Sequence, residues 1–309
     1  MMSRKYLFAA FVAACLGATS CGNDAEQTTE QATQRARVRL VCNTAMVTMN
    51  APSSRATLAA NGKALTDIYI FDYSKTTGAL LQVLHQTSTA TDFAEPELML
   101  DYGEHTIRVV ATRSTSPSLL DASGAAWTPA DNVPTSISGT ILATLTAAKT
   151  SDTFGASADV SVGVGTSQAV TITLDRLVAQ LVIDSKDTYP ADCSTFDIAL
   201  AEYRSISWAD LSVIGSENNH RITDVSSLAG KAGQAMTYFV LVPAEGYTTD
   251  VTITTNSTAG TQYASITVPN VPFARNKVTT ISGTFYNHQQ GFSVALNDTW
   301  DAEDNIINI

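Results

Sequence analysis

Apolar and polar side chains alternate along residues 34–46, the first regular segment of the chain. The apolar side consists of Ala36, Val38, Leu40 and Cys42, and the polar side consists of Arg35, Arg37 and Arg39. A period of two residues is typical of a β-strand with one buried face. We therefore expect these residues to form the first strand of the folded body, with the arginines in water.

Short segments rich in Val, Ile, Thr and aromatic residues follow at regular spacing, which predicts many short strands. The strands expected before residue 175 are 65–73, 80–85, 97–100, 106–111, 158–164 and 169–174. The segment 65–73 is apolar on both sides, as in a central strand of a sandwich. Residues 141–145 fit either a strand or a short helix. Residues 101–104 predict a hairpin, with Gly103 where a positive φ is needed.

The pattern restarts near Asp175. The strands expected in this second set are 177–183, 196–203, 237–243, 251–255, 263–268, 277–286 and 291–296. Residues 114–140 and 204–235 are expected to be irregular. The 309 residues are enough for about two domains. We predict an all-β fold of two tandem Greek-key β-sandwiches, at residues 36–174 and 175–309.

Residues 1–20 have the pattern of an export signal. Arg4 and Lys5 precede an apolar run that is too short to span a bilayer. Residues 18–21, Ala-Thr-Ser-Cys, resemble a bacterial lipobox, and this makes Cys21 the candidate lipidation site. A lipobox that ends at Cys15 and a plain secretory signal are the alternatives.

Residues 21–35 are polar and acidic, and we interpret them as a tether or propeptide between the lipid and the body. If Cys21 is acylated and the signal is removed, only Cys42 and Cys193 remain. They could form a disulfide in an oxidising compartment or stay as two buried thiols. No third ligand at zinc spacing accompanies them.

Composition and motifs argue against nucleic-acid binding and against catalysis. The net charge of −11 disfavours a nucleic-acid partner. Gly163 and Gly165 lack the Lys-Ser/Thr ending of a phosphate-binding loop, and no Gly-x-Ser-x-Gly elbow occurs. The acidic residues 298–305 lack the spacing of a calcium loop and predict a solvated tail. The scattered histidines, expected at the surface, are His85, His105, His220 and His288. We expect no catalytic residues, metal or cofactor.

Several segments in a fixed order make the chain similar to the fimbrillin superfamily of Bacteroidales, the subunits of lipoprotein-derived pili. The segments that carry the resemblance are the aromatic strand 65–73, Thr-Ile-Arg-Val-Val-Ala-Thr at 106–112, Asp-Arg-Leu-Val-Ala-Gln-Leu at 175–181, Val-Pro-Phe-Ala-Arg-Asn-Lys at 271–277 and the end 292–300. The lipobox precedes them all, and together they cover nearly the whole mature chain.

The resemblance implies two transthyretin-like sandwiches, a palmitate-bearing lipoprotein at the outer membrane, and assembly into a fimbrium with copies of itself or with other subunits. It also implies cleavage after an arginine near the first strand and filling of the resulting groove by a neighbour's terminal strand. The candidate residues are Arg35, Arg37 or Arg39 for cleavage, and Val294, Leu296, Ile306, Ile307 and Ile309 for the donated strand. Stalk, tip and anchor positions all remain open.

The alternative hypothesis is a glycan-binding lipoprotein of an outer-membrane polysaccharide uptake system. Such a protein needs exposed aromatic side chains that stack on sugar rings, and Trp127 and Trp208 are the candidates.

If the chain is instead a fimbrial subunit, surface ligands of a host or of other bacteria are further candidate partners.

Overall fold

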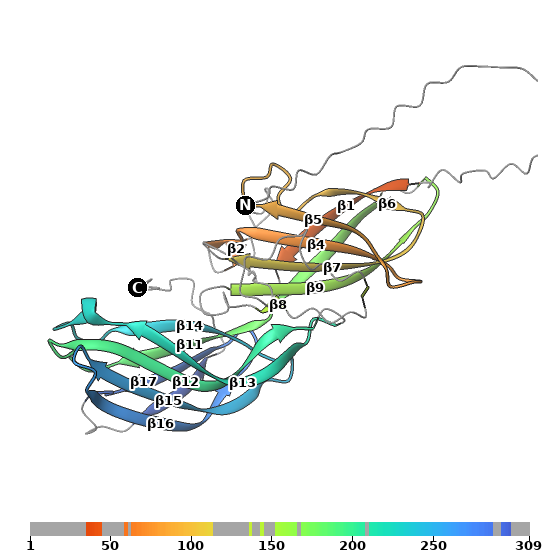
Figure 1. Ribbon diagram of the computed structural model, residues 1–309. Helices are drawn as coiled ribbons and strands as arrows, with labels where there is room; N and C mark the ends of the chain where they lie inside the picture. The colour runs from red at the N-terminus through yellow and green to blue at the C-terminus, as the bar shows by residue number, and fades with distance from the viewer. Residues whose placement is uncertain are drawn as a thin grey trace, which may run out of the picture. The chain divides into compact units, whose positions relative to one another are not determined.

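The computed structural model describes residues 35–44, 59–60, 63–113, 136–137, 143–144, 152–165, 168–207, 210–286 and 292–297. All of them belong to one compact unit, Gln34–Ile309. β-Strands dominate this part of the chain (Figure 1), and its one helical element is the short 3-10 helix Ser226–Leu228. The prediction of an all-β protein is confirmed.

A seven-stranded sheet holds the first part of the chain, in the spatial order β5-β4-β7-β9-β10-β1-β6. Its strands are β1 (Arg35–Thr44), β4 (Asp67–Ser74), β5 (Leu80–Thr87), β6 (Glu97–Asp101), β7 (Gly103–Arg113), β9 (Asp152–Val162) and β10 (Gln168–Arg176). β10 pairs with β9 only at Asp175 and Arg176. The sheet therefore divides at this corner into two layers, β5-β4-β7-β9 and β10-β1-β6, which share one apolar core.

A nine-stranded sheet holds the second part, in the order β16-β15-β12-β14-β11-β17-β18, with β8 and β13 also paired to β12. Its strands are β8 (Ala143–Thr144), β11 (Val178–Ser185), β12 (Cys193–Ile206), β13 (Val213–Asp224), β14 (Ala235–Leu241), β15 (Tyr247–Ser257), β16 (Gln262–Phe273), β17 (Val278–Gly283) and β18 (Ser293–Asn297). β12 meets β14 at the single pair Tyr203–Leu241. This sheet also divides into two layers around a core. The short strands β2 (Ala59–Ala60) and β3 (Lys63–Ala64) pair with each other.

β1 lies inside its layer, parallel to β10 and antiparallel to β6. Its alternation is the one expected from the sequence. Val38 and Leu40 are fully buried, while Arg35, Arg37 and Arg39 are exposed. β1 thus supplies both backbone hydrogen bonds to two neighbours and apolar surface to the core.

β4 is buried on both faces, as the continuous apolar segment predicts. Ile68 and Ile70 face the core of the first sandwich. Phe71 and Tyr73 face the opposite side and join a separate cluster that includes Leu177, between β10 and β11, and residues of the second sheet. A strand in such a position has no solvent-facing row, so its sequence does not alternate.

Two expectations about local structure are wrong. Residues 101–104 do not form a hairpin, because β6 pairs with β1 whereas β7 pairs with β4 and β9. The chain turns a corner there between the two layers, and Gly103 has a φ of +142°. Residues 204–235 are not irregular, because they contain β13, a strand of 12 residues.

The polarity of β13 hid it from pattern recognition. Its residues 215–218 are all exposed, and two of the side chains that it buries, Asn219 and Arg221, are polar. The strand therefore shows no apolar row, although it pairs with β12 directly before it in the chain. Arg221 on β13 is buried against Glu202 on β12, with Arg221 Nε 3.4 Å from Glu202 Oε1. The guanidinium also donates to the carbonyl oxygen of Phe239 at 2.8 Å.

Replacing a buried side chain of β1 should destabilise the protein far more than replacing an exposed one. Leu40→Ala removes fully buried apolar atoms and is expected to cost about 2–5 kcal/mol of unfolding free energy. Arg37→Ala, on the opposite face, should cost less than about 1 kcal/mol. Urea unfolding followed by intrinsic fluorescence measures both. Equal costs for the two variants would contradict the placement of β1.

Candidate functional site

The exposed face of β1 carries the three candidate cleavage arginines, and each of them pairs with an acid on or beside β6. Arg35 Nε lies 2.6 Å from Asp101 Oδ1, and Arg37 Nη1 lies 3.6 Å from Glu97 Oε1. Arg39 pairs with Glu95. The arginine side chains remain 55–71% exposed. Exposed pairs of this kind contribute at most about 1 kcal/mol each, so they leave the arginines accessible.

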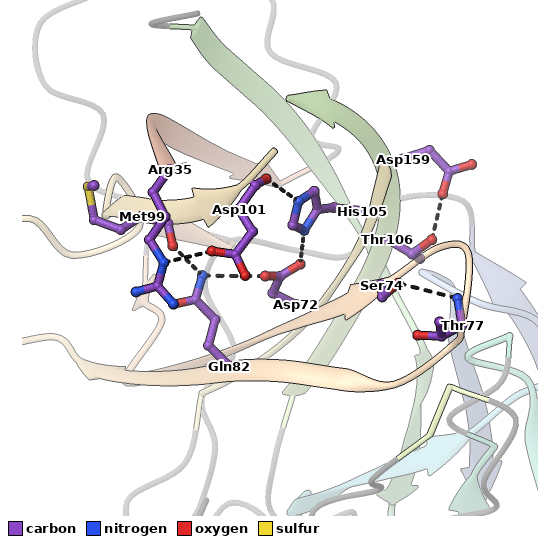
Figure 2. A network of polar contacts seen from close by, with 10 residues as sticks. All are labelled: Arg35, Asp72, Ser74, Thr77, Gln82, Met99, Asp101, His105, Thr106 and Asp159. Carbon is purple, nitrogen blue, oxygen red and sulfur yellow. Dashed lines mark hydrogen bonds and ion pairs between the residues drawn. The ribbon is translucent and has the colours of Figure 1, made fainter. Parts of the chain in front are cut away.

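Arg35 is also connected to a buried polar network (Figure 2). Its partner Asp101 accepts, through the backbone carbonyl oxygen, a hydrogen bond from His105 Nε2 at 2.7 Å. His105 Nδ1 lies 2.7 Å from Asp72 Oδ1, and both of these side chains are 2% exposed. The prediction that all four histidines lie at the surface is therefore wrong for His105. The network joins β4, β6 and β7 to the first residue of β1.

Both ring nitrogens of His105 face oxygen acceptors. Only the protonated imidazolium ring can donate to two acceptors at once. The hydrogen bond with Asp72 is the main cause that raises the pKa of His105, and burial opposes it. His105 therefore supports this corner of the sandwich best when it carries a proton.

Gln82 brings the two edge strands of the first sheet together. Its side-chain amide lies 3.4 Å from the carbonyl oxygen of Met99 on β6 and 3.4 Å from Asp72 Oδ2 (Figure 2). Because Gln82 belongs to β5, the β5 and β6 edges of the layers meet at this residue. Gln82 thus connects Asp72, the acidic partner of His105, to β6 of the other layer.

The second candidate region is β18, at one edge of the other sheet. β18 pairs only with β17, and all five of its residues are exposed. Val294 is 40% exposed and Leu296 is 42% exposed. Just before the strand, Phe292 packs against the core, and a Cβ on Gly283 would lie 2.4 Å from its ring. Glycine at this position therefore lets Phe292 dock.

The two candidate regions belong to different sheets and do not form one site. Several predicted residues lie outside the described residues, namely Cys21, Ile306, Ile307, Ile309, Trp127, Trp208 and His288. Cys42 and Cys193 are buried and free, so the open question of a disulfide is answered. Burial raises the pKa of Cys42 to about 12, which makes its thiol unreactive at neutral pH.

Two buried arginine–carboxylate pairs were also not predicted from the sequence. Arg176 donates to both carboxylate oxygens of Asp152, at 2.7 and 2.8 Å, and also contacts Asn276 of the second sandwich. The Glu202–Arg221 pair is the other. Arg176 stood in a segment that carries the family resemblance, but nothing in the sequence identified either partner.

No helix in the described part of the chain is long and apolar enough to cross a membrane. Within the same residues, no three His, Cys, Asp or Glu side chains are grouped so that they could hold a metal ion.

Residues 140–309 match a family described as a family of unknown function, DUF6562, and this match spans more than half of the chain. No curated protein sequence matches the chain significantly. A solved structure described as a candidate polysaccharide-binding protein (DUF1812) from Bacteroides thetaiotaomicron has a TM-score of 0.52 and 11% identity, over 85% of this chain and 96% of that chain.

Other similar structures come from Porphyromonas gingivalis. The fimbrial anchor protein Mfa2 has a TM-score of 0.47 and 10% identity, over 86% of this chain and 98% of that chain. The tip fimbrial protein Mfa3, with a C-terminal truncation, has a TM-score of 0.43 and 10% identity, over 86% of this chain and all of that chain. The structure with the TM-score of 0.52 shows the same fold as this chain, and at 11% identity the likeness concerns the fold alone.

Replacing His105 should remove a pH dependence of stability. Because the pKa of His105 is raised in the folded protein, its stabilising effect is complete below the ordinary pKa of about 6.5 and is lost as pH rises through the raised pKa. His105→Gln should therefore destabilise the protein more at pH 6 than at pH 8. Urea unfolding at the two pH values measures this. Asp72→Asn, which removes the charged partner, should reduce the same dependence, and a destabilisation independent of pH would contradict the assignment.

Proposed function

We propose that this chain, which belongs to the DUF6562 family of unknown function, is a structural and adhesive subunit of a cell-surface fimbrium. In this proposal it is exported as a lipoprotein through Cys21 and held at the outer membrane by its acyl chains. An arginine of β1 is then cut, and subunits join by exchange of a β-strand. The solved fimbrial proteins of similar fold support the proposal.

The position of β1 is the observation that carries the proposal. A protease would reach the arginines from solvent, because their side chains are 55–71% exposed. A cut after Arg39 would allow residues 35–39 to leave, with unpaired backbone groups on β6 and at the start of β10 and an apolar trough where Ala36 and Val38 now lie. An open sheet edge with an apolar floor is costly in water. A strand from another subunit would remove both costs by β-augmentation.

β18 has the properties that a donated strand needs. It is a terminal edge strand with one pairing partner, and its exposed Val294 and Leu296 alternate as the apolar row of β1 does. Releasing it exposes little new core, because none of its residues is buried. The residues beyond Asn297 would extend the donor.

Changing the three arginines to lysine should block arginine-specific cleavage without unfolding the strand. Lysine keeps the positive charge opposite Asp101, Glu97 and Glu95, so β1 should remain paired. Protein recovered from the cell surface is examined by intact mass and N-terminal sequencing. The chain with its arginines should start between residues 36 and 40. The lysine variant should start at an acylated Cys21. An acylated Cys21 in both proteins would exclude cleavage and leave an anchor subunit as the remaining fimbrial role.

Truncation after Phe292 should give a folded monomer that cannot join a fibre. Phe292 is kept because its ring packs against the core and contacts the ring of Phe285 at a centroid distance of 5.3 Å. Polymerisation is measured from the ladder of surface polymers on a denaturing gel run without boiling. Circular dichroism of the purified protein shows whether the truncated chain is folded. Val164→Asp, at an exposed turn, is the matched surface control and should polymerise normally. Normal polymers from the truncated chain would exclude β18 and the tail as the donor.

A further inference from the structure

The outer face of the second sheet has a hollow of about 370 Å³ that lies over β12, between β13 and β15. Its lining residues include Ala199, Ala201, Asn218, His220, Asp250 and Thr252. From these residues we infer a binding site for a neutral oligosaccharide. The inference does not depend on fimbrial assembly, and it concerns neither β1 nor β18.

The pairing register explains why the face is hollow here. Ala199 lies between His220 of β13 and Thr252 of β15, and Ala201 lies opposite Asn218. The small alanine side chains thus form a floor, with larger polar side chains on both sides. Neighbouring strands are about 4.8 Å apart, so the two walls stand about 9.6 Å apart, and the two alanine Cβ atoms lie about 6.7 Å apart along β12. These are distances between atom centres, so the space between the walls suits a narrow polar ligand that enters over the alanine floor.

The polar side chains suit hydroxyl groups, which both donate and accept hydrogen bonds. His220 Nδ1 lies 3.0 Å from each carboxylate oxygen of Asp197, and this contact orients the ring and leaves Nε2 for a ligand. Asp250 uses one oxygen to accept from the backbone N–H of Asn270 at 2.9 Å and has a second oxygen to offer. Asn218 is exposed and has both an amide donor and a carbonyl acceptor.

Apolar contacts complete the recognition of a sugar, whose ring carries C–H groups on its faces. The methyl groups of Ala199 and Ala201 supply this surface on the floor. Ile222, two residues after His220 on the same side of β13, is 67% exposed and extends it. An isoleucine so exposed in a strand has no packing role of its own.

Charge selects a neutral ligand over an anionic one. Asp250 lines the hollow, Asp197 contacts the lining residue His220, and the whole chain has a net charge of −11. Like charges repel, so uronic acid, sialic acid and sulfated glycans should be disfavoured. The expected ligands are uncharged hexose or N-acetylhexosamine oligomers.

The test uses purified protein with ¹³C-labelled alanine methyl groups, titrated with hexasaccharides built from maltose-type glucose, cellulose-type glucose, mannose or N-acetylglucosamine units. We expect at least one of these oligosaccharides to shift the methyl signals of Ala199 and Ala201. Ala201→Trp fills the hollow and should weaken binding at least about tenfold. Asn218→Ala should weaken it less, because it removes one hydrogen-bonding group.

Ser265→Trp is the matched control, since it places the same side chain on the same face of β16, outside the hollow, and should leave binding unchanged. Three results would overturn the inference: no shift with any of these sugars, equal binding by the Ala201→Trp variant, or binding only of polygalacturonate or heparin. Methyl shifts that depend on protein concentration alone would instead assign the hollow to contact between copies and would also overturn it. The Ala201→Trp variant should still assemble into fibres. Its fibre assembly therefore tests the proposed function separately from its sugar binding.

Discussion

The burial of the apolar side of β1 between β10 and β6 is the contact on which the first sandwich depends. Val38 and Leu40 have no exposed surface, and the backbone of the strand is paired on both sides. A central strand of this kind cannot leave without opening the core, because its neighbours lose hydrogen-bonding partners and apolar contacts together. The same strand is the first described segment of the chain.

Buried ion pairs complement this apolar core by specifying which strands meet. Arg176 connects β9 to the turn before β17 through Asp152 and Asn276. Arg221 and Glu202 connect β13 to β12. Buried pairs of this kind add little net stability, but breaking one leaves an uncompensated charge that costs about 3–5 kcal/mol. A shifted register of β13 would incur that cost, which explains how a strand with a polar centre keeps its position.

Local sequence patterns were sufficient to predict much of the fold. The alternation in β1 and the apolar run of β4 identified one half-buried strand and one buried strand, because side-chain burial follows the two-residue period directly. The turn at Gly103 was misread, because a turn sequence does not state which strands pair on either side of it. β13 was missed because two of the side chains that it buries, Asn219 and Arg221, are polar, so no apolar row marks the strand.

The candidate sites divide in the same way. The arginines of β1 could be predicted to face solvent from the strand period alone. The environment of His105 could not, since Asp72 and the carbonyl group of Asp101 reach it from two other strands. The hollow over Ala199 and Ala201 likewise exists only because β13 and β15 flank β12 with larger side chains. Two alanines in a strand carry no signal of a binding site until their neighbours are known.

The parallel pairing of β1 with β10 has a mechanical consequence. The two strands are in register over seven residue pairs, from Val38–Gln168 to Thr44–Leu174. The chain enters β1 at one end of this ladder and leaves β10 toward β11 at the other. Tension between these two ends pulls the strands lengthwise past each other, so the evenly spaced bonds of a parallel ladder share the load. A chain tethered at its amino end and pulled through its second sandwich is therefore loaded in shear, the direction in which a strand pair resists force best, and not by peeling one bond at a time.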